Sequence, residues 1–333
     1  CFLQNFKLNN VVLPSTIATL GYNAFEKTSS MTSLTIPNDA NNLWLIPSAC
    51  FVLSGITTIN LPNSVTHIDP HAFWFATSLV SINLPSSLKF IGGYAFSTCS
   101  NLTTIGPQLP QSIEIIGDEA FAFCGKLATP IKLPSSLVGF GTRVFMGCRL
   151  IPNVDLTDYK LTTIPNGAFM SCQSLTNVVI PEGVIESFGS VFNGCTGLQS
   201  VTLPNSLIRI SANDTFAGCS NLVNITLPPN LTRLGDWSFS GCAKLATINL
   251  PNTLTYIGYG VFNSCTLLNN ITIPEGINGV RFFFSNCQEL SNITLPSTII
   301  RIESSSFYNF KKLKSIILPQ GLETIENGAF YFS

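Results

Sequence analysis

The sequence predicts an all-β, irregular repeat fold: a solenoid of about fourteen turns of roughly 23 residues, with two short strands per turn and little helix. Three observations carry this prediction. A Leu-Pro step or a close variant recurs every 22–25 residues, aliphatic residues follow the proline, and a phenylalanine comes about eleven residues after it. We expect residues 1–333 to form a single repeat domain. The prolines are Pro14, Pro37, Pro62, Pro85, Pro110, Pro134, Pro181, Pro204, Pro228, Pro251, Pro274, Pro296 and Pro319, and Thr157 takes the place of one.

Each repeat is expected to begin with a strand that is buried on one side. From Leu245 to Pro251, apolar residues take the first, fourth and sixth places, and the polar side chains between them point to the opposite face. Proline cannot donate a hydrogen bond to a neighbouring strand, so it marks the strand's end. A second apolar pair, such as Leu254 and Ile257, predicts a second short strand. Residues 41–44 and 106–108 lengthen two repeats, and loops are expected to absorb them.

One phenylalanine per repeat predicts a buried aromatic column. No single turn can enclose its own ring, so each phenylalanine is expected to stack on its counterpart in the next turn. The column comprises Phe25, Phe51, Phe73, Phe96, Phe121, Phe145, Phe169, Phe192, Phe216, Phe239, Phe262, Phe284, Phe307 and Phe330.

Composition narrows the classes of partner. Hydrophobic residues make up 45% of the chain, charged residues only 10%, and the net charge is −1. Such a chain lacks the net positive charge whose electrostatic field would attract nucleic acid or an anionic membrane. It also lacks an apolar run long enough to span a bilayer. We therefore expect no nucleic-acid partner and no membrane insertion by this segment. Because Cys1 and Ser333 both fall within a repeat, we expect the chain to be a piece of a longer protein.

Cysteines form a second column, three residues after the phenylalanine. Neighbouring turns would bring their Cα atoms within disulfide distance. However, Thr28, Ser54, Ala76 and Phe310 occupy the same position in other repeats, which favours free thiols packed as small apolar groups. Disulfides between neighbours and metal binding remain alternatives. The column comprises Cys99, Cys124, Cys148, Cys172, Cys195, Cys219, Cys242, Cys265 and Cys287.

Few other residues suggest a catalytic, metal-binding or phosphate-binding site. His67 and His71 flank a proline that prevents a helix, which favours a polar turn over a metal site or an acid–base pair. Arg209, Arg233 and Arg301 share one repeat position, which favours a solvated face over a phosphate site. No glycine-rich phosphate loop, nucleophile elbow or paired carboxylates stand out. We therefore expect no catalytic residue, cofactor or metal.

The outward strand face is the best candidate for binding. Two residues before the proline, the side chains are mostly neutral hydrogen-bonding groups, which can engage a glycan or a protein backbone but are also ordinary solvated strand residues. Trp44, in a lengthened turn, and Trp74 are candidate anchors, unless they only cover the core. The face residues singled out are Thr202, Thr226, Asn249, Thr272 and Thr294.

The successive motifs resemble those of the BspA-like leucine-rich repeat surface proteins. LPNSL is followed by LGDWSF or IGGYAF and then by AGCSNL or SGCAKL, and the likeness covers essentially the whole chain. The asparagine usual in longer leucine-rich repeats is replaced by Ser136, Gly183 and Ser206 at the corresponding positions. The resemblance implies a leucine-rich-repeat solenoid at a cell surface or secreted, used for adhesion, and it supplies no catalytic residues.

These observations favour a non-enzymatic recognition module that binds a host matrix protein, a cell or a glycan through the strand face. An intracellular scaffold of the same fold is the main alternative, since free thiols suit a reducing compartment. The ectodomain of a receptor is a third reading. The sequence does not specify an oligomeric state.

Overall fold

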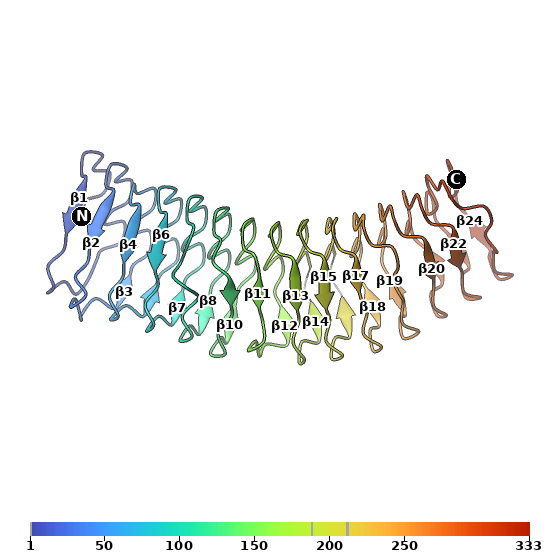
Figure 1. Ribbon diagram of the computed structural model, residues 1–333, viewed down its shortest axis with the longest axis horizontal. Helices are drawn as coiled ribbons and strands as arrows, with labels where there is room; N and C mark the ends of the chain where they lie inside the picture. The colour runs from blue at the N-terminus through green and yellow to red at the C-terminus, as the bar shows by residue number, and fades with distance from the viewer. Residues whose placement is uncertain (1, 188, 211–212) are drawn as a thin grey trace. The chain divides into compact units, whose positions relative to one another are not determined.

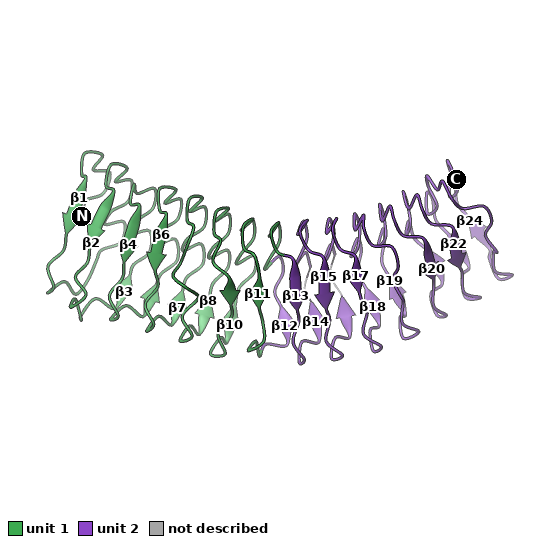
Figure 2. Cartoon of the chain, viewed as in Figure 1, with its two compact units in different colours: residues 1–160, 168–175 green, residues 161–167, 176–333 purple. Residues whose placement is uncertain are grey.

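The computed structural model describes residues 2–187, 189–210 and 213–333. They form a parallel β-solenoid of about fourteen turns, and no helix occurs among them, which confirms the predicted fold class (Figure 1). The chain divides into two compact units, residues 1–160 with 168–175 and residues 161–167 with 176–333 (Figure 2). That residues 1–333 form one domain stays a prediction, which a single cooperative unfolding transition would support.

We call first-sheet strands those that precede the repeat proline. In unit 1 they pair in the orders β1-β2-β4-β6 and β11-β9, and in unit 2 in the orders β13-β15-β17 and β20-β22, always in parallel. Their bounds in unit 1 are Asn10–Val12 (β1), Ser33–Thr35 (β2), Thr58–Asn60 (β4), Ser81–Asn83 (β6), Ile131–Lys132 (β9) and Val154–Asp155 (β11). In unit 2 they are Asn177–Val179 (β13), Ser200–Thr202 (β15), Asn224–Ile225 (β17), Asn270–Thr272 (β20) and Asn292–Thr294 (β22).

Second-sheet strands follow the proline and close the other side of each turn. They pair in the orders β10-β8-β7-β5-β3 in unit 1, and β12-β14-β16-β18-β19 and β21-β23-β24 in unit 2. In unit 1 they are Leu45–Ile46 (β3), His67–Ile68 (β5), Phe90–Ile91 (β7), Ile115–Ile116 (β8) and Gly139–Phe140 (β10). In unit 2 they are Thr163–Ile164 (β12), Glu186–Ser187 (β14), Arg209–Ile210 (β16), Arg233–Leu234 (β18), Tyr256–Ile257 (β19), Gly279–Val280 (β21), Arg301–Ile302 (β23) and Thr324–Ile325 (β24).

Some turns lack the first-sheet strand that the repeat predicts. Thr104 makes only an isolated bridge with Ser81, and the extra residues 106–108 follow directly after it. Thr247 likewise makes only a bridge with Asn270. The segment 314–318 carries the apolar pattern but forms no strand. The repeat pattern therefore predicts where each turn lies more reliably than it predicts the strand hydrogen bonds between turns.

The phenylalanine column is a stacked core within each unit. Ring centroids of successive residues from Phe2 to Phe169 in unit 1 lie 4.8–5.8 Å apart with nearly parallel planes. In unit 2 the same series runs from Phe192 to Phe330 at 4.8–6.1 Å. Such contacts add to the energy gained from burying the rings, so neighbouring turns stabilise one another.

The cysteine column is a ladder of thiols that bond to the preceding turn. Each described cysteine is free and buried, which agrees with the predicted packing role. Cys99 donates its S–H to the carbonyl oxygen of Phe73 at 3.1 Å, and burial raises the pKa of the Cys265 thiol to about 12. The same bond to the phenylalanine one turn earlier recurs, at 3.1–3.3 Å, for Cys124, Cys148, Cys172, Cys219, Cys242, Cys265 and Cys287.

A second ladder is built from hydroxyl groups two residues after the proline. The Ser136 hydroxyl lies 2.8 Å from the Gln111 carbonyl oxygen and 2.6 Å from that of Ile113, both in the preceding turn. A short hydroxyl side chain thus fills the position where longer repeats carry asparagine. Equivalent bonds are made by Ser64, Ser87, Ser112, Ser206, Thr253 and Thr298.

Replacing Ser136 by alanine should lower the free energy of unfolding by about 1–2 kcal/mol, because the partly buried Ile113 carbonyl and the exposed Gln111 carbonyl lose their donor. The exposed neighbour Ser135 supplies the matched control, and Ser135→Ala should change stability by less than about 0.5 kcal/mol. Urea denaturation of both variants measures the difference. Equal effects would show that the hydroxyl ladder contributes nothing specific.

Candidate binding surface

The five predicted face residues of unit 2 lie on the outer side of the first sheet. Thr202, Thr226, Asn249, Thr272 and Thr294 are all exposed. Parallel pairing places equivalent residues side by side, and Thr272 is opposite Thr294. The strand pattern therefore identifies correctly which side chains reach solvent, because alternate residues of a strand point to opposite faces.

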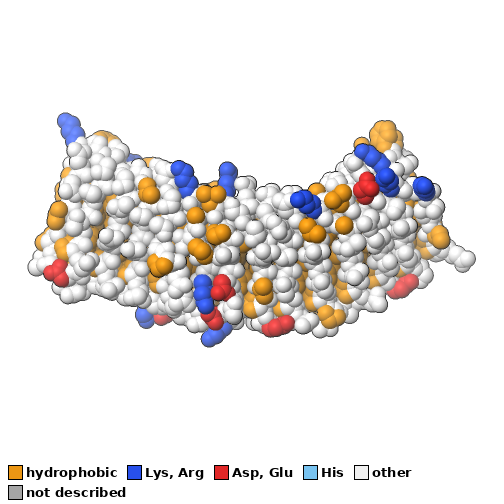
Figure 3. Space-filling view, in the orientation of Figure 1, with side chains coloured by type: hydrophobic (Ala, Val, Ile, Leu, Met, Phe, Trp, Pro, Cys, Tyr) orange, Lys and Arg blue, Asp and Glu red, His pale blue; other side chains and the backbone are white. Residues whose placement is uncertain are grey.

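Most of the first-sheet face is neutral. Figure 3 shows this side of the molecule, and its charged side chains lie mainly along the margins. An exception in unit 1 is Lys132, whose Nζ lies 3.1 Å from Asp158 Oδ2 and 3.7 Å from Asp155 Oδ2. Hydrogen bonds from Thr157, together with the charge of Lys132, hold the pKa of Asp155 below its ordinary value. Lys132 offsets one of the two carboxylates, so the group keeps a single net negative charge.

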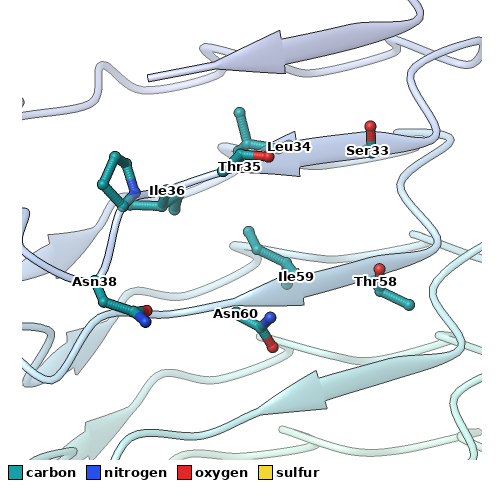
Figure 4. A pocket seen from close by; sticks show the side chains of 9 residues that line it. Ser33, Leu34, Thr35, Ile36, Asn38, Thr58, Ile59 and Asn60 are labelled. Atoms are coloured by element: carbon teal, nitrogen blue, oxygen red, sulfur yellow. The ribbon is translucent and has the colours of Figure 1, made fainter. Parts of the chain in front are cut away.

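Unit 1 contains a cavity where two first-sheet strands diverge. β2 and β4 pair only at Ser33 and Thr58, and beyond that point they enclose a cavity of about 450 Å³ (Figure 4). Thr35, Asn38 and Asn60 bring polar groups to its wall. The lengthened turn that contains residues 41–44 follows β2 at this end of the strands.

A second cavity adjoins the first. It has a volume of about 380 Å³ and shares Asn38 and Asn60 with its neighbour, while Asn63 and Asn83 complete a wall rich in amide groups. Together these two cavities form what we call the amide groove. Primary amides both donate and accept hydrogen bonds, so the groove can pair with a protein backbone without an ion pair.

Unit 2 has a smaller cavity on the same sheet. It measures about 190 Å³ and lies where β17 ends beside a turn that has no regular first-sheet strand. Thr226 and Asn249 line it together with Asn224 and Thr247. The structure therefore brings two of the predicted face residues together at a recess.

The two predicted tryptophan anchors lie elsewhere. Trp44, which is 52% exposed, contacts the His67 ring edge-on at 5.7 Å and precedes β3 of the second sheet. Trp74 is 36% exposed and contacts His71 at 5.4 Å. Neither tryptophan lines the cavities described above, so they do not join the first-sheet face residues in one site.

The two histidines belong to separate aromatic contacts. His67 Nδ1 lies 2.8 Å from the Thr66 hydroxyl, and the His71 ring stacks on Tyr94 with centroids 5.2 Å apart. Within the described ranges, no group of three histidine, cysteine or acidic side chains is arranged to hold a metal ion. No helix in the described part of the chain is long and apolar enough to cross a membrane.

The family model of the BspA type leucine-rich repeat region (6 copies) matches four overlapping segments of the chain, residues 1–108, 106–214, 189–283 and 280–333. The chain belongs to this family. BspA-type repeats thus account for the motifs, the turn length and the parallel solenoid. No curated protein matches the chain.

Solved structures agree with this BspA-type assignment. A leucine-rich repeat protein from Bacteroides ovatus ATCC 8483 is 28% identical, with a TM-score of 0.75 over 92% of this chain and 77% of the other. A leucine-rich cell surface protein from Faecalibacterium prausnitzii A2-165 is 25% identical, with a TM-score of 0.59 over 92% of this chain and 86% of the other. A repeat protein from Eubacterium ventriosum ATCC 27560, 19% identical with a TM-score of 0.58 over 84% and 83%, shares the fold.

The sequence did not reveal the amide groove. Its walls come from residues of three turns, and its first cavity lies where β2 and β4 pair at a single position. The available signals were the interval of 25 residues between Pro37 and Pro62 and the asparagines that flank the repeat prolines, Asn38, Asn60, Asn63 and Asn83.

Proposed function

We propose that this chain is a non-enzymatic recognition and adhesion module, displayed at a cell surface or secreted, that binds a protein through the first-sheet face. The observation that carries the proposal is the amide groove, which offers unpaired hydrogen-bonding groups in a neutral recess. The similar protein from Faecalibacterium prausnitzii is described as a cell surface protein, which supports the location. A glycan is the alternative ligand for the same face, since its hydroxyl groups also pair with amides.

An intracellular scaffold remains the second candidate. The free cysteines favour it, because thiols persist most readily in a reducing compartment. Their burial, which raises the pKa of Cys50 and Cys265, weakens this argument, because a protected thiol reacts slowly in an oxidising environment as well. Locating the protein on intact and permeabilised cells with an antibody separates the two functions. Signal only after permeabilisation would contradict surface display.

A partner bound at the first-sheet face should be displaced by lysine substitutions. The quadruple variant T202K/T226K/T272K/T294K, and separately N60K/N83K in the amide groove, should weaken binding at least tenfold, because unpaired charges would be desolvated. Thr226→Lys alone should weaken it only modestly. Binding of the unmodified chain should change little with salt, since a contact without ion pairs is scarcely screened.

The experiment begins with an array of extracellular matrix proteins and glycans, followed by titration of the ligand that is captured. The matched control is R209K/R233K, which conserves charge on the other sheet and should leave this binding unchanged. Circular dichroism melts establish that each variant is folded. If both lysine variants fold and still bind at full strength, the first-sheet face is not the recognition surface.

A further inference from the structure

Unit 2 carries a row of arginines on the second sheet, the side of each turn that the proposed function does not use. Arg209 in β16 is directly opposite Arg233 in β18, and Arg233 is opposite Tyr256 in β19. Arg301 lies in β23, two turns after Tyr256. Arg281 follows β21, so it comes from the turn between them. We call Arg209, Arg233, Tyr256, Arg281 and Arg301 the arginine stripe.

Tyr256 holds two of these arginines in place. The Cζ atom of Arg233 lies 3.9 Å from the centroid of the Tyr256 ring, and that of Arg281 lies 5.8 Å from the same centroid. In the turn after Tyr256, the first residue of the second-sheet strand is Gly279 instead of an arginine or a tyrosine. A Cβ atom on Gly279 would lie 4.0 Å from Arg281 Nε. Arg281 therefore covers the glycine. Stacking fixes a guanidinium plane and leaves its edge free to donate hydrogen bonds.

The charges of the stripe are only partly neutralised. Arg281 Nε lies 3.9 Å from Glu303, and Arg301 forms an ion pair with Glu326. Among the described residues, neither Arg209 nor Arg233 has a carboxylate within 4.0 Å, although Glu186 is opposite Arg209 in the sheet. Like charges directly opposite each other in a sheet are destabilising.

Among the acidic groups beside the stripe, Asp236 makes its hydrogen-bond contacts with tyrosines of the next turn. Asp236 Oδ1 accepts a hydrogen bond from the Tyr259 N–H at 2.9 Å and lies 3.5 Å from the Tyr256 hydroxyl. Burial, and then the charge of Asp236, raise the pKa of Asp214 above its ordinary value. The adjacent Arg209 and Arg233 therefore form the part of the stripe that should attract an external anion most strongly.

An aromatic cluster adjoins this basic row. The rings of Tyr259 and Phe282 stack with centroids 5.1 Å apart, and Trp237 meets Tyr259 edge-on at 5.2 Å. Gly260 has a φ of +63°, and a Cβ atom on it would lie 2.4 Å from the Trp237 ring, so only glycine leaves room for the tryptophan. Phe282 directly follows Arg281 in the chain, so this partly exposed cluster offers an apolar shelf at the Arg281 end of the stripe.

We propose that the arginine stripe binds a linear anionic glycan that carries sulfate or carboxylate groups. Neighbouring turns lie about 4.8 Å apart, a step close to the length of one pyranose ring, so successive sugars can meet successive turns. Same-face residues of an extended acidic peptide recur about every 6.6 Å and fall out of step with the turns. Arginine pairs bidentately with sulfate and carboxylate, and the aromatic shelf suits the apolar face of a sugar ring.

The test is titration of the intact chain with heparin, with hyaluronan as the carboxylate-only chain, and with neutral dextran and poly-glutamate. Heparin, hyaluronan or both should bind, while dextran should not, and poly-glutamate should bind at least tenfold more weakly than the better glycan. R209Q/R233Q should weaken glycan binding at least tenfold and reduce its salt dependence. The matched control K312Q/K314Q removes two charges elsewhere in unit 2 and should change binding less than twofold.

Tyr256→Leu separates a built site from general charge attraction, because it keeps the net charge but releases the stacked guanidinium groups. It should weaken binding about threefold or more with an unaltered melting temperature. Binding neither glycan, equal losses from both glutamine pairs, no effect of Tyr256→Leu in a folded variant, or a preference for poly-glutamate would each overturn the proposal. The lysine variants of the first-sheet face should bind the anionic glycan normally, so the two proposals can fail separately.

Discussion

Replacing Phe216 by alanine should lower the free energy of unfolding by about 3–5 kcal/mol. Its ring is buried between Phe192 and Phe239, with centroid distances of 5.7 and 5.4 Å. Removal leaves a cavity and takes a stacking partner from both neighbours, so the loss combines the transfer and cavity contributions. Urea denaturation, followed by far-ultraviolet circular dichroism, measures the change.

Phe330→Ala is the control for this experiment. Phe330 stacks on Phe307 at 4.8 Å, but it is only half-buried and makes one ring contact in the column instead of two. Its replacement should cost less than half as much as that of Phe216. Equal losses at the two positions would argue that the phenylalanines contribute individually rather than as a stack.

Raising the pH above about 9 should destabilise the fold steeply. Burial raises the pKa of Cys50 and Cys265 from 9.0 to about 12, and it raises the pKa of Cys99 and Cys242 well above the ordinary value. Between pH 9 and 12 the unfolded chain loses these protons while the folded chain keeps them. The unfolded state then binds fewer protons, so stability falls as pH rises, by about 1.4 kcal/mol per pH unit for each such thiol. Below pH 9 the contribution is fully present.

Denaturation midpoints at pH 8.0, 9.0 and 9.5 test this expectation before tyrosine ionisation dominates. Cys265→Ala should make stability fall less steeply with rising pH, because it removes one titrating group. Alanine is accommodated at this repeat position, as Ala76 shows. Thiol titration without reductant should find few reactive groups in the folded protein and about eleven after unfolding. A pH-independent midpoint, or fewer than four thiols after unfolding, would contradict a column of protected thiols.

The repeat pattern predicted the parts of the fold that a single side-chain position determines. The spacing of Phe25 and its counterparts predicted the stacked core, and alternation predicted that residues such as Thr226 face solvent. Substitutions within the cysteine column indicated free thiols. In each case the required information lies within one turn and is repeated in the others, so a one-dimensional pattern captures it.

The binding surfaces depend on relations between turns, which the pattern does not contain. The first cavity of the amide groove needs β2 and β4 to part after Ser33 and Thr58. The arginine stripe depends on Gly279 having no side chain, because the Arg281 side chain, two residues further along, occupies the space next to it. The sequence placed Arg209 and Arg233 in one column, but it gave no sign of Tyr256 as the ring between arginines. Trp44 was predicted from its residue type and its lengthened turn, and Trp74 from its residue type beside Phe73; both lie away from the first-sheet cavities.

The thiol and hydroxyl ladders give assembly of the solenoid a direction. Cys99 reaches back 26 residues to Phe73, and Ser136 reaches back 23 residues to Ile113, so the donors of one turn find their acceptors in the turn already synthesised. During translation the N-terminal turns emerge first. The thiol and hydroxyl donors of each new turn therefore meet acceptors that are already in place, whereas backbone N–H groups such as that of Phe96, which donates to the Ala120 carbonyl, are satisfied only when the next turn arrives. Within each unit, turns can therefore fold one after another from the N-terminal side, each packing on the turn that was synthesised before it.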